Sequence, residues 1–497
     1  MRIFAMIHRA VRASLAVALF SFACPAPTAA MVGDPGLEAA ARIIDAEAAR
    51  HPNGSMTVAI VVRGDLAWVR SYGFADAQGQ VPATPDTVYR IGSITKQVTG
   101  FALLRLVADG GARLDDPVVR LVPELRAALG DPAAPVDLLA LATHRAGLAR
   151  EPDDPDHVYS TGQIDQWRAL ASEALQHTRA PFAPNDRGRY SNIGYAALGL
   201  AIERASGSPY VDFVHDRITA PLGMSSTTFH LDDDGLARLA VGYRSSAGTD
   251  TAEAASEVAG GRGYRVPNGG LFSTAADLAR FMAFEMGKAP RSPIHPALVA
   301  DNFNRRYPAV DGGLFGVGFA EVTYGQRRLV GHSGLTTGYA SSAYFDPDEQ
   351  IGVICLGSAE DMCQSRFIDV YAALSPAWLP VAEARRAEQA AIALRVREQQ
   401  PYEQGEAVLR QFIARLADGR PDYDRLGPVL GDAVRDNLAL LQGQFSALGP
   451  VHSIEFAGVE SGGADVYRVR FADSAMEWRI TLTGEGVLET ATMRPAP

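Results

Sequence analysis

The sequence predicts an α/β fold with a helical insertion, because strand-like stretches stand on both sides of a long helical block. Strand patterns occupy residues 56–72 and return after about residue 310. Between them, residues 110–260 are mainly helical patterns broken by Pro and Gly. Strands before and after the block indicate one sheet-containing domain into which the helices are inserted.

The sheet is expected to begin with a β-hairpin. Residues 56–62 and 66–72 have strand patterns, and Gly64-Asp65 between them is typical of a tight turn. After the helical block, stretches rich in β-branched and aromatic residues predict strands over 315–322, 328–331, 338–345 and 350–356. The other elements expected in this domain are a short strand over 87–91 and helices over 37–49, 94–108, 165–177, 193–205 and 364–374.

A small α+β unit is expected at the C-terminal end. Residues 380–400 are rich in Ala, Arg and Glu, which is typical of a solvated helix that joins two units. Beyond it, helices are predicted over 403–416 and 426–446 and strands over 451–459, 465–471, 476–483 and 487–494, an order that resembles NTF2-like domains. The predicted organisation is a signal peptide over 1–30, one domain over 31–378, a linking helix over 379–402 and an α+β unit over 403–497.

The overall composition is that of a soluble protein with more than one domain. Hydrophobic residues make up 47% and charged residues 21% of the chain, and 497 residues are more than one core usually holds. The formal net charge is −11 at pH 7. An acidic chain without runs of basic residues is not expected to bind nucleic acid.

The first 30 residues have the features of an export signal. Arg2, Arg9 and Arg12 form a positive start, residues 13–23 are apolar, and Thr28-Ala29-Ala30 offers small residues for cleavage. The apolar stretch is about half the ~20 residues that a membrane-spanning helix needs. We therefore expect a periplasmic or secreted protein that meets the membrane only if this segment stays uncleaved.

The three cysteines of the chain allow two interpretations. Removal of the signal would take Cys24 and leave Cys355 and Cys363, which an oxidising compartment allows to form a disulfide. Equally, both can be small buried apolar residues. The ten histidines form no HExxH and the chain has no CxxC, so no metal site is expected, and no cofactor is predicted.

Ser93-Ile94-Thr95-Lys96 stands where a predicted strand gives way to a helix. One helical turn places residues i and i+3 on the same face, so Lys96 can accept the proton of Ser93 as the hydroxyl attacks a carbonyl. The helix start also favours developing negative charge. The ordinary alternative is that Ser93 only caps the helix.

The scarcity of lysine strengthens the catalytic interpretation. The chain contains only two lysines, Lys96 and Lys288, among 46 basic side chains. Arginine cannot be deprotonated in a protein, whereas a buried lysine can act as a base. A chain that otherwise avoids lysine has one at the position where arginine would fail.

Two further short motifs carry polar groups suited to acyl transfer. Tyr190-Ser191-Asn192 offers a phenol that can relay a proton and an amide that can hold both Lys96 and a substrate carbonyl. His332-Ser333-Gly334 is expected at the end of the strand over 328–331, where a glycine lets a substrate backbone approach closely. Taken singly, each motif is also common in ordinary loops and strand edges.

In this order, the three motifs resemble the SxxK, YxN and KTG-like motifs of the serine β-lactamase and penicillin-binding-protein superfamily, which includes D,D-peptidases, class C β-lactamase-like proteins and esterases. The resemblance implies a β-lactamase/transpeptidase-like antiparallel sheet flanked by helices over about residues 35–375. Further stretches that are similar to family segments are Leu138–Leu148, Pro221–Met224, Gly269–Thr274 with Asp277 and Leu278, and Thr337–Ala340.

The resemblance implies a role for each matching residue. Ser93 forms the acyl-enzyme, and Lys96 and Tyr190 share the acid–base work. Asn192 positions the substrate amide, and the backbone N–H groups of Ser93 and Leu335 form the oxyanion hole.

His332 and Gly334 are expected to bind substrate. His332 stands where true β-lactamases have the lysine that helps to bind the antibiotic carboxylate, so efficient β-lactam hydrolysis is in doubt. The HxG form is similar to that of D,D-carboxypeptidase, D-aminopeptidase and esterase members.

The predicted function is therefore exported serine hydrolysis of a small-molecule or peptide substrate, such as a D-amino-acid peptide, an ester or a β-lactam-like compound. One alternative is a penicillin-binding or sensor-type protein that is acylated without efficient turnover. Another is a structural protein with an inactive site.

Overall fold

The computed structural model describes residues 34–496, except for residues 52–53, 131–135, 154–163, 246–251, 255–261, 311, 364–366 and 473. The predicted signal peptide over 1–30 and Cys24 lie outside the described residues. Within the described part of the chain, no helix combines the length and the apolar character needed to cross a membrane.

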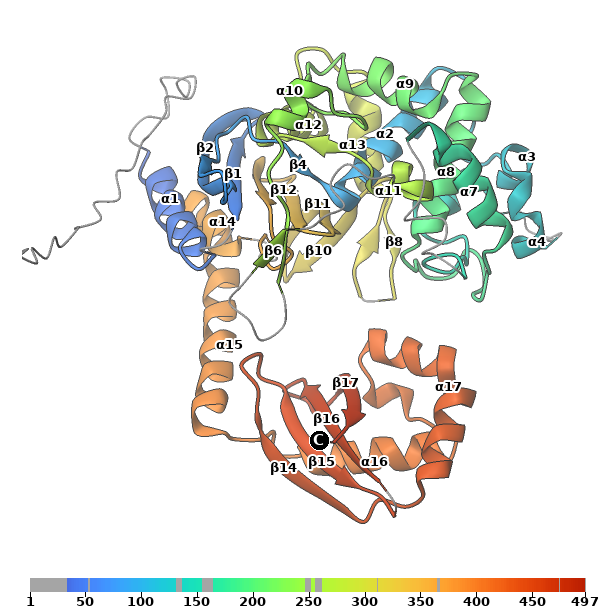
Figure 1. The fold of residues 1–497 in the computed structure, drawn as a ribbon, viewed down its shortest axis with the longest axis vertical. Coiled ribbons are helices and arrows are strands. Elements are labelled where there is room, and N and C mark those ends of the chain that lie inside the picture. Colours follow the sequence, from blue (N-terminus) through green and yellow to red (C-terminus); the bar gives the residue numbers. More distant parts are fainter. Residues whose placement is uncertain are drawn as a thin grey trace, which may run out of the picture.

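Nine strands between residues 55 and 357 form one sheet (Figure 1). Its strand order is β3-β2-β1-β13-β12-β11-β10-β9-β8, and every neighbouring pair is antiparallel. The strands are β1 Ser55–Val62, β2 Asp65–Asp76, β3 Val81–Pro82, β8 Tyr307–Pro308, β9 Leu314–Phe315, β10 Ala320–Tyr324, β11 Arg327–Thr336, β12 Tyr339–Asp346 and β13 Ile351–Gly357.

The helical block is inserted between the two sets of strands, as the sequence predicts. Two short pairs, β4 Tyr89–Arg90 with β7 Phe272–Ser273 and β5 Tyr243–Ser245 with β6 Ala252–Ala254, lie outside the main sheet. The helices up to residue 375 are α1 Pro35–Ala48, α2 Thr95–Ala108, α3 Val118–Leu121, α4 Arg126–Leu129, α5 Leu138–Ala142, α7 Trp167–Gln176, α8 Asn192–Ser206, α9 Tyr210–Val214, α10 Asp233–Ala237, α11 Val266–Gly269, α12 Ala275–Glu285, α13 Pro296–Asn304 and α14 Ile368–Leu374.

The inner strand β1 shows why the sheet has a core on each face. Side chains alternate along a strand, so Met56, Val58 and Ile60 join the apolar cluster that includes residues of α1 and α14. Ala59 and Val61 face the opposite way and join the larger cluster that includes residues of α2 and α12. Burial on both faces explains why residues 56–62 are almost continuously apolar.

Helix α2 lies at the centre of the larger core. Ten of its residues are buried, including Lys96, and the ring of Phe101 packs edge-on against Phe284 at a centroid distance of 4.8 Å. A helix enclosed on nearly all sides holds its first turn in a fixed position, which matters because Lys96 is in that turn and Ser93 lies just before it.

Three sequence predictions need correction. The turn of the first hairpin is Arg63-Gly64, one residue earlier than predicted, because both residues adopt positive φ and β2 already begins at Asp65. The predicted strand over 315–322 is two strands, β9 and β10. The strand predicted over 328–331 continues to Thr336, so His332-Ser333-Gly334 lies inside β11, where pairing with β12 extends it.

The C-terminal elements match the predicted helices and strands closely. The linking helix α15 spans Leu379–Glu398 and leads to α16 Gly405–Ala417, α17 Pro428–Leu448 and an antiparallel sheet of β14 Ser453–Val459, β15 Asp465–Arg470, β16 Ala475–Leu482 and β17 Leu488–Pro495 (Figure 1). These helices and strands share a separate apolar cluster that includes Leu409, Phe445 and Trp478. Arg395 of α15 bonds to Asp465 at 2.5 Å and to the Gly463 carbonyl at 2.9 Å, which fixes the linking helix to this unit.

Cys355 and Cys363 form a disulfide, which confirms the first of the two interpretations of these cysteines. Their Cα atoms are 5.5 Å apart, within the usual range for a bridge. The bond ties the end of β13 to the segment eight residues later, and both cysteines are also buried.

Replacing Cys363 by Ala is expected to lower the free energy of unfolding by about 2 kcal/mol, because the bridge closes a short loop and so restricts the unfolded chain. Thermal unfolding, followed by circular dichroism, measures the effect. A reducing agent should lower the midpoint of the wild-type protein toward that of the variant and leave the variant unchanged. Equal midpoints for oxidised wild type and Cys363→Ala would contradict the expectation.

Candidate active site

Ser93 and Lys96 lie side by side at the start of α2. Ser93 belongs to a short 3₁₀ turn over Gly92–Ile94, and α2 follows from Thr95. The Lys96 Nζ atom is 3.0 Å from Ser93 Oγ. Neither the 3₁₀ turn nor α2 has a side-chain cap, so the interpretation of Ser93 as a helix N-cap is wrong.

The Lys96 amine is completely buried. Besides Ser93 it contacts the Asn268 carbonyl, to which Nζ donates a 2.7 Å hydrogen bond. Burial lowers the pKa of Lys96 well below its usual range; the charge of Glu151 opposes this shift, and those of Arg150 and Arg265 add to it. A depressed pKa makes it easier for a lysine to reach its neutral form, whose lone pair can accept a proton.

Tyr190 lies over the same amine. The Lys96 Nζ atom is 4.9 Å from the centre of the Tyr190 ring, and the phenol forms a hydrogen bond with Ser93. Burial raises the pKa of the phenol, and the bond to Ser93 lowers it only in part. His144 supports this segment, because its ring stacks on Tyr190 at 4.6 Å and its Nδ1 accepts the Ser191 N–H at 3.1 Å.

Asn192 is near the site but does not contact Lys96 as predicted. Its Nδ2 donates to Glu151 at 2.6 Å, while its Oδ1 is buried without a hydrogen-bond partner among the described residues. Glu151 also accepts a hydrogen bond from the Tyr264 hydroxyl and pairs with Arg265 at 3.4 Å. The unpartnered Oδ1 remains free to accept a hydrogen bond from a substrate amide.

Asn268 and Glu151 are members of the site that the sequence analysis missed. Asn268 is 172 residues from Lys96, and its Nδ2 donates to the Asn192 carbonyl at 3.0 Å. It directly precedes the Gly269–Thr274 segment that resembles the family, which is the signal that could have found it. Glu151 belongs to no motif, and no comparable signal along the chain points to it.

Strand β11 offers a free backbone edge to this cluster. Strand β10 pairs with β11 only as far as Gly331, whereas β12 pairs with it as far as Thr336. From His332 onward the described part of β11 therefore has a strand neighbour on one side only. The open side carries unpaired backbone groups on which an extended substrate can bind.

Two glycines allow β11 to approach the Ser93 segment. A Cβ atom on Gly334 would lie 2.1 Å from the Ile91 carbonyl oxygen, and one on Gly92 would lie 3.0 Å from the Leu335 nitrogen. Gly92 also has a φ of +47°, which favours glycine. Gly334 is therefore needed for contact within the chain, and not only for approach of a substrate as predicted.

His332 is a neutral group in this site. Its ring is buried, lies 5.8 Å from the Tyr190 ring, and has Nδ1 2.5 Å from the Ser333 carbonyl oxygen. Burial, with the charge of Lys96, lowers the pKa of His332 to about 3. His332 can act as a hydrogen-bonding group near neutral pH but supplies no positive charge.

A small cavity of about 40 Å³ joins these parts. Its lining includes Gly92, Ser93, Asn192, Asn268 and Leu335 together with three arginines, Arg90, Arg262 and Arg265. Ser93 and Leu335, whose N–H groups are the predicted oxyanion hole, thus border one space.

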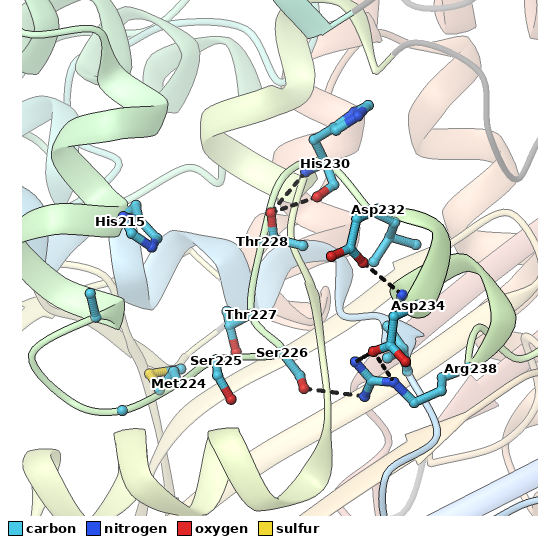
Figure 2. Close-up of a pocket in the computed structure, with 15 residues that line it drawn as sticks. His215, Met224, Ser225, Ser226, Thr227, Thr228, His230, Asp232, Asp234 and Arg238 are labelled. Atoms are coloured by element: carbon cyan, nitrogen blue, oxygen red, sulfur yellow. Dashed lines mark hydrogen bonds and ion pairs between the residues drawn. The ribbon is translucent and has the colours of Figure 1, made fainter.

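A larger cavity of about 480 Å³ lies elsewhere on the same domain (Figure 2). It shares no lining residue with the Ser93 cavity. Its charged groups are already engaged: Asp234 pairs with Arg238 at 2.7 Å, and Asp232 caps α10. Of these two cavities, only the smaller is lined by Ser93. Among the described residues, no cluster of three or more His, Cys, Asp or Glu side chains could hold a metal ion.

The C-terminal unit contacts the segment that carries Tyr190. Arg189 pairs with Asp432 of α17 at 3.4 Å, and its guanidinium stacks on the Phe182 ring at 3.9 Å. Both members of the ion pair are mostly buried. The C-terminal unit therefore contacts Arg189, the residue next to Tyr190.

Comparison with known proteins gives the family. Residues 40–375, more than half of the chain, match the family described as Beta-lactamase. The chain belongs to the β-lactamase family. The D-alanyl-D-alanine-carboxypeptidase/endopeptidase AmpH of Escherichia coli (strain K12) is 31% identical over 228 residues, which are 45% of this chain and 55% of AmpH. The chain thus spans little more than half the length of this curated relative.

Solved structures show the same β-lactamase-family fold. The octameric penicillin-binding protein homologue from Pyrococcus abyssi superposes with a TM-score of 0.58 at 21% identity, over 93% of this chain and 96% of that one. The D-amino acid amidase from Ochrobactrum anthropi SV3 gives 0.57 at 24% identity, over 70% and 99% of the two chains. At these identities the likeness concerns the fold alone.

Lys96→Arg is expected to lower kcat/KM about a thousandfold, because a guanidinium stays protonated and cannot act as the base. Hydrolysis of a chromogenic ester measures the loss. Lys288→Arg, at the exposed second lysine, is the matched control and should leave kcat/KM unchanged. An arginine variant at position 96 that keeps a tenth of the activity would contradict the assignment.

The pH profile provides an independent check. Because the pKa of Lys96 is depressed, the neutral amine forms at a lower pH than in an ordinary lysine. We expect kcat/KM to fall as pH drops through that depressed pKa and to be flat above it. A profile that keeps rising to about pH 10, the usual lysine range, would show that the amine is not the depressed base.

Proposed function

We propose that the chain is an exported serine hydrolase that cleaves an ester or amide through an acyl-enzyme on Ser93. The observation that carries the proposal is the buried Lys96 amine 3.0 Å from the Ser93 hydroxyl. A serine hydroxyl is a weak nucleophile until an adjacent base removes its proton. The depressed pKa of Lys96 provides that base without a histidine.

In the acylation step, Ser93 Oγ bonds to the substrate carbonyl carbon as its proton passes to Lys96. The N–H groups of Ser93 and Leu335 stabilise the resulting oxyanion, for which one well-placed donor contributes about 3 kcal/mol. The Tyr190 phenol, hydrogen-bonded to Ser93, gives its proton to the leaving group and is reprotonated from Lys96. In deacylation, water attacks the acyl carbon as the same pair accepts its proton, and the bond from that carbon to Ser93 Oγ breaks as the proton passes to Oγ.

The proposed substrate is a D-amino-acid peptide, amide or ester. AmpH and the amidase from Ochrobactrum anthropi are named for such substrates. The free Oδ1 of Asn192 and the open edge of β11 suit an extended amide-containing chain. Because His332 is neutral, it supplies no positive charge at the position where β-lactamases have a lysine, and β-lactam hydrolysis is expected to be weak.

The proposed location, periplasmic or secreted, rests on the N-terminal sequence and agrees with the disulfide, a bond typical of oxidising compartments. The C-terminal unit has the helices and the four-stranded sheet expected of it, and its likeness to NTF2-like domains stays a prediction. Its contact through Asp432 supports a role in holding the Tyr190 segment.

A substrate panel on wild type and Ser93→Ala tests the function. The panel comprises D-alanyl-D-alanine peptides, D-aminoacyl amides, short-chain p-nitrophenyl esters and a cephalosporin. Ser93→Ala should lose at least about a thousandfold in kcat, because removing the nucleophile ends the acyl-enzyme route. Activity that survives in this variant would refute the mechanism.

The same proteins separate the penicillin-binding alternative. Turnover with release of many product molecules per enzyme supports the hydrolase. Stoichiometric labelling of Ser93 by a fluorescent penicillin without turnover would support a sensor-type protein instead. Absence of labelling by both penicillin and a fluorophosphonate would indicate an inactive site.

A further inference from the structure

We propose that Arg90 binds a carboxylate on the acyl part of the substrate, so that the preferred acyl donor is acidic. The inference rests on the proposed function and specifies its substrate class. It starts from the side chain of Arg90, which lines the Ser93 cavity.

Arg90 is a buried guanidinium without a partner. It is 6% exposed, and no hydrogen bond or ion pair of its side chain is found among the described residues. The phenol of Tyr339 is close enough to feel its charge, but burial raises the pKa of that phenol, and the hydroxyl donates its own hydrogen to the Ala240 carbonyl at 2.6 Å. Burying an unpaired charge is costly, and an arriving carboxylate would offset that cost.

The rest of the cavity lining has the same sign of charge. Arg262, which donates to the Gly270 and Phe229 carbonyls, and Arg265 also border it, and among the described residues no carboxylate does. Glu151, the nearest acidic group in the site, is engaged by Asn192, Tyr264 and Arg265. In a chain with a net charge of −11, this local excess of guanidinium groups marks the cavity as a site for an anion.

The positions of the other groups show which part of the substrate the anion belongs to. Tyr190, which protonates the leaving group, lies next to His332 on one side of Ser93. The leaving group is therefore on the His332 side. Arg90 borders the cavity with Leu335 and Thr336, further along β11 and away from His332. The acyl part extends in this direction.

The size and geometry of the site suit a carboxylate. The cavity, at about 40 Å³, has room for a small group, since one water molecule takes up about 30 Å³ of liquid. A guanidinium presents paired N–H groups that match the two oxygens of a carboxylate. An acyl donor with a side-chain carboxylate, such as a D-glutamyl group, meets these requirements.

The test compares two isosteric substrates, the p-nitroanilides of D-glutamate and D-glutamine, which differ only in a side-chain carboxylate or carboxamide. Wild type should prefer the D-glutamyl substrate at least tenfold in kcat/KM, because charge-assisted hydrogen bonds are the stronger ones. The preference should shrink as ionic strength rises. Equal rates, or a preference for D-glutamine, would overturn the inference.

Arg90→Gln should bring the ratio of the two rates close to one, and Arg90→Lys should keep part of it. A ratio is informative because a general loss of folded enzyme lowers both rates equally. The matched control is Arg145→Gln, which removes a half-buried arginine that stacks on Tyr307 outside the cavity and should keep the wild-type ratio. If Arg90→Gln does not fold, the wild-type preference and its salt dependence still decide the matter.

A second pair of substrates places the carboxylate on the leaving group: N-acetyl-D-alanyl-D-alanine and its C-terminal amide. Arg90→Gln should leave this ratio unchanged, whereas a change here alone would assign Arg90 to the leaving-group side and refute the inference. If wild type hydrolyses the neutral D-glutaminyl substrate and Ser93→Ala does not, that result supports the proposed function independently of the role of Arg90. If neither anilide is cleaved, protection of Ser93 from a neutral fluorophosphonate by D-glutamate but not D-glutamine remains the deciding result.

Discussion

Burial of one lysine amine beside one serine hydroxyl is the constraint around which this structure is arranged. An ammonium ion without water or a carboxylate partner is unstable, so the Lys96 amine loses its proton easily and becomes a base. That effect requires α2 to be enclosed. The sheet packs on it from one direction and the helical block from the other, which is why the helices are inserted between the two sets of strands.

Close approach of backbones sets the shape of the cleft. Gly92 and Gly334 let β11 come against the Ser93 segment, and Gly100, one helical turn beyond Lys96, lets α2 lie against Gly318. Any side chain at these positions would separate the segments. The serine, the N–H groups beside it and the free edge of β11 thus form one rigid unit, which suits a reaction in which donors must already point at the developing oxyanion.

Neutral and charged groups are distributed unevenly around Ser93. Tyr190 and His332 are buried and neutral. Arg90, Arg262 and Arg265 border the Ser93 cavity, whose lining includes neither Tyr190 nor His332. A lysine in place of His332 would put a positive charge next to the buried Lys96 amine, whereas the neutral histidine does not.

The sequence by itself determined the local features: the strand and helix order, the hairpin, and the Ser93–Lys96 pair, because the i,i+3 spacing on a helix fixes their proximity. The scarcity of lysine pointed to Lys96 as the proposed base. Nearly all other basic residues of the chain are arginines, and arginine cannot be deprotonated in a protein. Only the tertiary structure decided that Asn268 and Glu151 join the site, that Cys355 and Cys363 are bridged, and that Arg90 is left without a partner. These contacts depend on which distant segments pack together. The spacing of residues along the chain does not show which segments those are.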